Sequence, residues 1–315
     1  MATSLPTEEE VLGYIKRLSN WGRWGSDDQL GTLNLITPEK RRQAAALVRD
    51  GVTVPCAWPI VAAAAADVTS QPMHLMLSSG ESAHNQGPTP PGSLQGVSDF
   101  FGLVFHGHTI THVDALSHIF YNGKMYNGKP ANLITTAQGA TYHSIEAVAG
   151  GIVSRGVLLD IARLRGVDWL ERGESILPDE MEAAEAAQGV RVEEGDVLLV
   201  RTGHLPRRDR EGPKPLAMGR PGLHAACLPW LRERGVAMLG ADMANDVSPS
   251  GYEALQQPIH QIGIPAMGLW LLDNCNLEAL SQACAERRRW EFMIAMAPLR
   301  IRYGTGSPVT PIAIF

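Results

Sequence analysis

Four of the ten histidines in this 315-residue chain crowd into one short segment, Phe105-His-Gly-His-Thr-Ile-Thr-His-Val-Asp-Ala-Leu-Ser-His118. Imidazole nitrogens and one carboxylate are the ligands of Zn²⁺ and Mn²⁺ sites that retain a water molecule. The charge of such an ion makes that water nucleophilic. A single histidine is more often an ordinary core or surface residue. The density of this cluster instead predicts a divalent-metal site with hydrolytic chemistry.

The spacing of His108, His112 and Asp114 restricts the backbone that can bring them to one ion. On a helix Asp114 would lie about 240° round from His108. On a strand His112 and Asp114 point to the same side about 6.6 Å apart, whereas His108 lies roughly 13 Å from His112. We therefore expect a bend between His108 and His112, an extended segment up to Asp114, and all three residues as metal ligands. His118 is then the nearest acid or base, and His106 is expected to be structural.

Residues outside this segment could complete the site. His260, in Gln257-Pro-Ile-His-Gln261, is the best candidate for a distant ligand, because three local ligands are usually completed by a remote residue or by water. The alternative is a hydrogen-bonded loop histidine. Asp242 and Ser248 could bind substrate or orient a histidine, although a role in a turn is equally compatible. Arg201 and His204 follow a predicted strand, where ligand sites often gather, but we expect a structural role first.

The elements that position these residues are strands alternating with helices. Apolar runs at 156–160, 196–203 and 236–241 are typical of buried strands, and caps with apolar spacing predict helices at 7–18, 37–48, 178–187 and 224–233. The alternation indicates an α/β fold, and the β-rich first half and the C-terminal tail indicate a mixed β-sheet with flanking helices. We expect one domain over residues 1–315 with an N-terminal helical extension over about 1–50. Residues 79–97 are predicted to form an exposed loop, either a connector or a cover over the site.

The composition, 44% hydrophobic and 19% charged, is that of a globular protein. A formal net charge of −6 argues against nucleic acid or an anionic membrane as a partner, so a small-molecule substrate is expected. The N-terminus lacks the pattern of a secretory signal, and the apolar run at 61–66 is too short to span a membrane. Four scattered cysteines indicate a reduced, cytoplasmic protein. The absence of a GxSxG elbow and of a P-loop argues against a serine hydrolase and against nucleotide binding.

The pattern His108-xxx-His112-x-Asp114-xxx-His118, with Thr111 before the second histidine, resembles the signature of the cyclase family. That family includes bacterial kynurenine formamidases and isatin hydrolases. The likeness covers most of the chain, through Tyr126-Asn-Gly128, Val197 to Gly203, His260, Ala297-Pro-Leu and Gly306-Ser-Pro308. The resemblance implies a swivelling β/β/α fold, one or two Zn²⁺ or Mn²⁺ ions, and a homodimer or homotetramer. It also implies hydrolysis of an amide, lactam, lactone or ester bond in a small cyclic or aromatic molecule.

Two positions depart from the formamidase pattern. Ile110 stands where a glycine usually precedes Thr-His, and the late glutamate is replaced around Leu272-Asp273, where Asp273 could still bind a metal. We therefore expect one Mn²⁺ or Zn²⁺ ion. The N-terminal region and the segment 273–277 resemble longer members of the family rather than the formamidases. The alternatives to a hydrolase are a metal-dependent cyclase or dehydratase of a biosynthetic pathway and a noncatalytic metal-stabilised binding protein.

Overall fold

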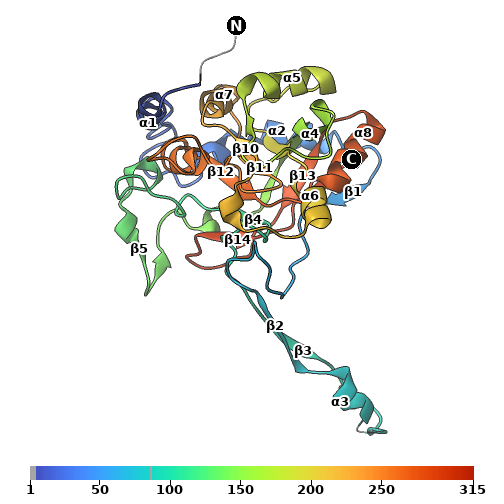
Figure 1. The fold of residues 1–315 in the computed structure, drawn as a ribbon. Helices are drawn as coiled ribbons and strands as arrows, with labels where there is room; N and C mark the ends of the chain where they lie inside the picture. Colours follow the sequence, from blue (N-terminus) through green and yellow to red (C-terminus); the bar gives the residue numbers. More distant parts are fainter. Residues whose placement is uncertain (1–4, 86) are drawn as a thin grey trace.

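A nine-stranded mixed β-sheet forms the centre of the protein (Figure 1). The structure, a computed structural model, describes residues 5–85 and 87–315. Four strands, β7, β9, β11 and β12, are parallel to one another, and the remaining neighbours pair antiparallel. The predicted mixed sheet is confirmed. Its strand order is β1 (Thr53–Pro55), β15 (Ile312–Ile314), β13 (Glu291–Met296), β7 (Ile152–Asp160), β9 (Val197–Arg201), β11 (Met238–Ala241), β12 (Trp270–Asp273), β4 (His112–Asp114) and β14 (Gly306–Pro308).

The parallel strands are the buried apolar runs of the sequence. The predicted strands at 156–160, 196–203 and 236–241 correspond to β7, β9 and β11, and β7 begins earlier, at Ile152. Because these strands are parallel, their carboxyl ends lie along one edge of the sheet. Strand β4 runs antiparallel to β12, so its first residue, His112, lies at that same edge.

Helices flank the sheet, and local caps set most of their ends (Figure 1). Thr7 and Glu10 form the predicted capping box of the first helix, and Gly189, with φ of 63°, ends the helix that begins at Pro178 as predicted. The α-helices of the body are α1 (Glu8–Arg17), α2 (Pro38–Ala45), α4 (Ile161–Leu164), α5 (Pro178–Gln188), α6 (His204–Glu211), α7 (Cys227–Arg234) and α8 (Glu278–Arg287).

Two helices are shorter than predicted because other backbone hydrogen bonds compete with them. Helix α2 ends at Ala45 rather than at 48, since the amides of Asp50 and Gly51 donate to the carbonyl of Phe315 and draw the chain toward β15. Helix α7 begins at Cys227 rather than at 224. The amide of His224 instead donates to the carbonyl of Ile176, next to the pairing of β10 (Gly222–Leu223) with β8 (Ser175–Ile176).

A two-stranded hairpin projects from the body (Figure 1). It consists of β2 (Met73–Ser78) and β3 (Ser98–Gly102), with the short helix α3 (Gly80–Asn85) between them, and residues 73–85 and 87–102 are called the arm. The predicted exposed loop at 79–97 is largely exposed, but it contains α3, which the prediction missed. The two strands that flank this segment were not predicted either. All six residues of β2 are exposed, and the run Leu75-Met76-Leu77 shows no alternation that would reveal a strand.

One continuous hydrophobic core extends from Val11 in α1 to Phe315 at the C-terminus. In the part of the chain that the structure describes, no helix has the length and apolar character needed to cross a membrane. The remaining elements are η1 (Gly31–Leu35), η2 (Tyr126–Gly128), η3 (Ala131–Leu133), β5 (Ile134–Thr135), β6 (Gly139–Ala140), η4 (Ile145–Val148), η5 (Leu216–Met218) and the π-helical segment η6 (Ile259–Met267).

Candidate metal centre

Strand β4 places His112 and Asp114 between β12 and β14. Asp273 pairs opposite His112, and directly paired residues face the same side of a sheet, as do alternate residues of one strand. His112, Asp114 and Asp273 therefore face one side. Their candidate ligand atoms lie within 4.8 Å of one another, and all three residues are buried. The backbone bends over residues 106–110 and is extended over His112–Asp114, as the spacing predicted.

The carboxylate of Asp114 is the focus of the centre. Its Oδ1 lies 2.9 Å from Nδ1 of His106 and 3.4 Å from Nε2 of His112, and its Oδ2 lies 3.5 Å from Nε2 of His260 and 4.0 Å from Nε2 of His118. Burial alone would raise the pKa of Asp114, but the surrounding imidazoles, His118 foremost, hold it well below its usual value. Both oxygens are buried, and among the described residues these ion-pair contacts lack the geometry of hydrogen bonds.

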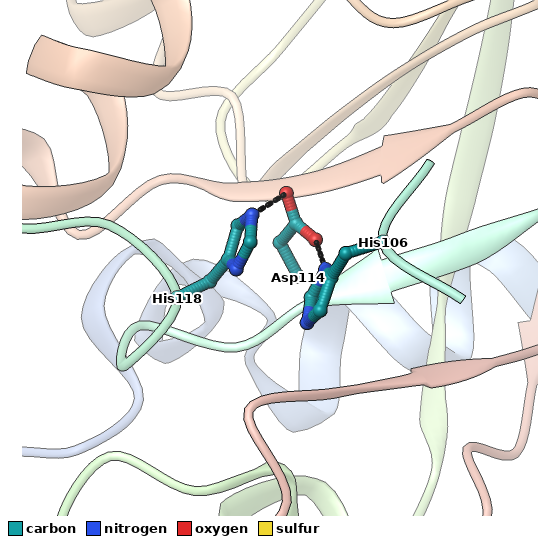
Figure 2. Close-up of side chains that lie close together, drawn as sticks. All are labelled: His106, Asp114 and His118. Atoms are coloured by element: carbon teal, nitrogen blue, oxygen red, sulfur yellow. Dashed lines mark ion pairs between the residues drawn. The ribbon is translucent and has the colours of Figure 1, made fainter. Parts of the chain in front are cut away.

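His106 and His118 both point toward the Asp114 carboxylate (Figure 2). Their rings stack with centroids 3.7 Å apart and planes 5° apart. With Asp114 they form a second group whose ligand atoms lie within 4.8 Å of one another. Burial lowers the pKa of His118 to about 4, despite the nearby charge of Asp114. His118, predicted as an acid or base, thus lies close enough to Asp114 to bind the same ion. The same is true of His106, which was predicted to be structural.

Polar partners fix the orientation of the buried side chains in the centre. Nδ1 of His112 lies 2.8 Å from the carbonyl of Ile110, which leaves Nε2 to face Asp114. Nδ1 of His260 lies 2.5 Å from Oδ2 of Asp246, so its Nε2 faces Asp114 and Asp273. Burial opposes the charged form of His260, but the carboxylates of Asp273, Asp114 and Asp246 outweigh it and hold its pKa well above the usual value.

His108 lies at the margin of this centre rather than in either group. It is partly buried, and its Nδ1 is buried without a hydrogen-bond partner among the described residues. Burial foremost, together with the charge of Arg220, lowers the pKa of His108 to about 4, against the opposing effect of Asp273. The imidazole is therefore neutral near pH 7, the form in which histidine binds metals.

These donors suit a divalent transition-metal ion. A buried carboxylate whose oxygens accept no well-aligned hydrogen bond is costly unless a ligand satisfies it. Imidazole nitrogens together with carboxylate oxygens are the donor set of Zn²⁺ and Mn²⁺ sites. Carboxylate and carbonyl partners behind His260 and His112 orient the rings in the way usual for metal-binding histidines.

Four other residues singled out in the sequence have structural partners. Asp242 accepts hydrogen bonds from the amides of Thr202, Gly203 and His204 and thereby holds the turn between β9 and α6. Ser248 precedes Pro249 through a cis peptide bond and lies in the backbone pairing with Arg220. Arg201 forms ion pairs with Asp160 and Glu278. The ring of His204 stacks on that of Trp58, with ring centroids 5.7 Å apart.

The sequence reasoning missed the role of Asp246 and Asn245, which hold His260 and Asp273. The one available signal was position, because Asp246 closely follows the predicted strand at 236–241. Asp273 was considered only through the family pattern, and the register of β12 against β4 is what brings it to His112.

The fold and the centre match one known family. Residues 47–245 match the family described as "Putative cyclase". A crystal structure described as that of a novel cyclase resembles this chain with a TM-score of 0.86 and 33% identity, over 96% of this chain and 99% of that chain. The protein therefore belongs to this cyclase family.

Isatin hydrolases share the fold. Isatin hydrolase A from Labrenzia aggregata, bound to benzyl benzoate, aligns with a TM-score of 0.57 and 19% identity over 86% of this chain and 96% of that chain. Isatin hydrolase A from Ralstonia solanacearum aligns with a TM-score of 0.56 and 19% identity over 99% of both chains. A search of curated proteins gives no match to this sequence.

Proposed function

We propose that the protein is a metal-dependent hydrolase that cleaves an amide, lactam, lactone or ester bond in a small cyclic or aromatic molecule. The observation that carries the proposal is the buried Asp114 carboxylate, which is surrounded by imidazole nitrogens and accepts no well-aligned hydrogen bond in the described residues. The shared fold with isatin hydrolases, which are hydrolases by name, supports the reaction class. The four cysteines are free and buried, which fits a reducing, cytoplasmic location.

In this proposal His108, His112, Asp114 and His260 hold one Mn²⁺ or Zn²⁺ ion, with Asp273 within reach. Lewis acidity and a water of lowered pKa are what such an ion supplies when bound. His118 would take a proton from the attacking water and pass it to the leaving nitrogen or oxygen. It is suited to that task because its ring is partly exposed at the edge of the centre, whereas His112 and Asp114 are buried.

The first test is metal content and turnover. The purified protein is expected to contain about one Mn²⁺ or Zn²⁺ per chain and to lose activity to chelators. Activity is sought in a panel of lactams, lactones, esters and aryl formamides with either metal added, and hydrolysis is recognised by a product one water heavier. A product of unchanged mass or one lighter by water would support the cyclase or dehydratase alternative. A metal without an exchangeable water would support the noncatalytic binding protein.

A second test separates the roles of His112 and His118. His112→Ala should lose metal and activity together, because water replaces an imidazole ligand poorly. His118→Ala should retain most of the metal and lose roughly two to four orders of magnitude in turnover, the usual contribution of general acid or base catalysis. Metal stoichiometry and rate are measured side by side. Metal loss in His118→Ala would make His118 a ligand, together with its stacked neighbour His106.

We further propose that the protein is a homodimer or homotetramer in which the arm contacts a second copy. On one face of the arm the large apolar side chains of Met73, Leu75 and Phe100 are 55%, 55% and 43% exposed, and Leu75 pairs directly with Phe100. The sequence contains no lysine or arginine between Arg49 and Lys124. Exposed edge strands are ordinarily protected by such charges.

The body carries a surface that suits this arm. An apolar groove of about 690 Å³ begins at Phe101, at the base of the arm, and includes Ile60, Met296, Leu299 and Val309. One chain thus carries both a projecting apolar element and an apolar groove, which is the self-complementarity of a symmetric interface. Leu75→Lys should lower the mass measured by light scattering to that of a monomer. Leu94→Lys is the control, since Leu94 is 99% exposed near the tip. A monomeric wild-type protein would refute the assembly.

A further inference from the structure

A small basic cavity adjoins the metal centre at His108. Its volume is about 30 Å³. That is more than the roughly 10–15 Å³ needed to hold a water molecule, so the cavity can admit a small polar group. Its walls include Asp67, His108, Arg172, Arg208, Lys214 and Arg220. Three arginines and one lysine line the cavity together with one carboxylate, so its walls carry a net positive charge.

Two of the four cations are neutralised by partners in the protein. Nε of Arg208 lies 2.6 Å from Asp67, and Nη2 of Arg172 lies 2.8 Å from Glu211. The side chains of Lys214 and Arg220 have no carboxylate within 4.0 Å in the described residues. Lys214 is exposed, so water solvates its charge. Arg220 is only 7% exposed and lacks that compensation.

The buried guanidinium of Arg220 is incompletely satisfied. Its Nε donates to the carbonyl of Asp246 at 3.1 Å, and no described acceptor binds Nη1 or Nη2. Because burial in a poorly compensated site disfavours the charged form, the pKa of Arg220 is lowered, against the opposing effect of Asp246 and Asp273. A buried charge without a partner is costly and is rarely retained unless a ligand completes it. The planar fork of a guanidinium matches a carboxylate through two parallel hydrogen bonds.

We propose that Arg220 binds a carboxylate group of the substrate, remote from the bond that is cleaved, and that the enzyme therefore selects anionic substrates. This inference rests on the proposed hydrolase function. Asp246 links the two parts of the site, because its carbonyl holds Arg220 while its carboxylate holds His260. The distance from the anchored carboxylate to the centre is thereby fixed, which favours one substrate geometry.

The test compares the binding of benzoate and of its neutral analogue benzamide by calorimetry, on the protein as purified and with its metal content measured. Wild type should prefer benzoate, and Arg220→Gln should lose roughly 10- to 100-fold of that preference, the usual effect of removing a hydrogen bond between charged groups. Any attraction of benzoate to a bound ion is common to both proteins and cancels in the comparison. Arg220→Lys, which keeps the charge without the fork, should fall between them.

Arg210→Gln is the matched control, because Arg210 is an exposed arginine of α6 that lies over Trp169 rather than in the cavity wall. It should bind both compounds as wild type does. Urea unfolding establishes that each variant is folded, and Arg220→Lys alone carries the test if Arg220→Gln is not. An unchanged preference in the Arg220 variants would overturn the proposal and leave Arg220 as a counter-charge to Asp246 and Asp273. No turnover is measured, so this failure is distinct from failure of the hydrolase proposal.

Discussion

Replacement of Asp246 by asparagine tests whether His260 belongs to the metal centre. Oδ1 of Asp246 accepts from the amide of Ile259 at 2.6 Å, and Oδ2 lies 2.5 Å from Nδ1 of His260. An asparagine has the same shape but only one accepting oxygen. Whichever way its amide is turned, an NH₂ group faces either the Ile259 amide or the Nδ1 hydrogen of His260. Because Oδ2 also accepts from the backbone amide of His260 at 3.3 Å, Asp246→Asn must leave at least one buried donor unsatisfied.

The minimum size of the effect follows from the loss of one accepting oxygen. An unsatisfied buried donor costs about 1–3 kcal/mol, which corresponds to roughly 5- to 150-fold in an equilibrium constant. If the amide oxygen turns to Ile259, His260 loses its orienting partner and metal affinity falls, in line with the roughly 10- to 100-fold usual for an outer partner of a metal ligand. If the amide oxygen turns to His260 instead, the Ile259 amide loses its acceptor and the free energy of unfolding decreases.

Both quantities are measured on the same preparation. Mn²⁺ is titrated into chelator-treated protein by calorimetry, and urea unfolding of the metal-free protein gives its stability. Asp99→Asn is the control, because Asp99 pairs with His74 on the exposed arm and should change neither quantity. If Asp246→Asn left metal affinity and stability both at wild-type values, the assignment of His260 as an oriented ligand would be refuted.

Three further substitutions test the frame around the centre. Asp242→Ala removes the acceptor of the amides of Thr202, Gly203 and His204 and should lower the free energy of unfolding by about 3–5 kcal/mol, as in other broken buried charge networks; near-wild-type urea unfolding would contradict this. Thr111→Val should cost about 1–3 kcal/mol, because the hydroxyl donates to the Asn274 carbonyl and accepts from the Trp58 amide, and an unshifted urea midpoint would count against it. Gly222→Ala would bring a Cβ to 2.5 Å from the carbonyl carbon of Asp246, so both stability and Mn²⁺ affinity should fall, and normal Mn²⁺ affinity would show that Asp246 can move without cost.

The local backbone conformation of the site could be predicted from the sequence. The spacing of His112 and Asp114 required an extended backbone with a bend before it, and β4 and residues 106–110 have that form. The caps of α1 and α5 were equally readable, since each depends on residues within one turn of the helix end. In both cases the deciding interactions lie within a few residues along the chain.

The parts that were not predictable depend on contacts between distant segments. The early end of α2 results from hydrogen bonds to Phe315, and the late start of α7 results from pairing of Gly222–Leu223 with residues 175–176. The strands of the arm have no buried face and therefore no alternating pattern. The stack of His106 on His118 depends on the loop between β3 and β4, whose course no local pattern specifies.

The position of β4 in the sheet explains why the centre forms beside β12 and at no other parallel strand. The carboxyl ends of β7, β9 and β11 also bring charged residues to this edge, namely Asp160, Arg201 and Asp242. Arg201 and Asp160 neutralise each other at 2.9 Å, and Asp242 is occupied by backbone amides. Of these four residues, only Asp273 pairs with a histidine: it lies opposite His112, the first residue of the antiparallel strand β4. Its charge is therefore left to the imidazoles of His112 and His260, and a divalent ion placed among them would complete the same arrangement.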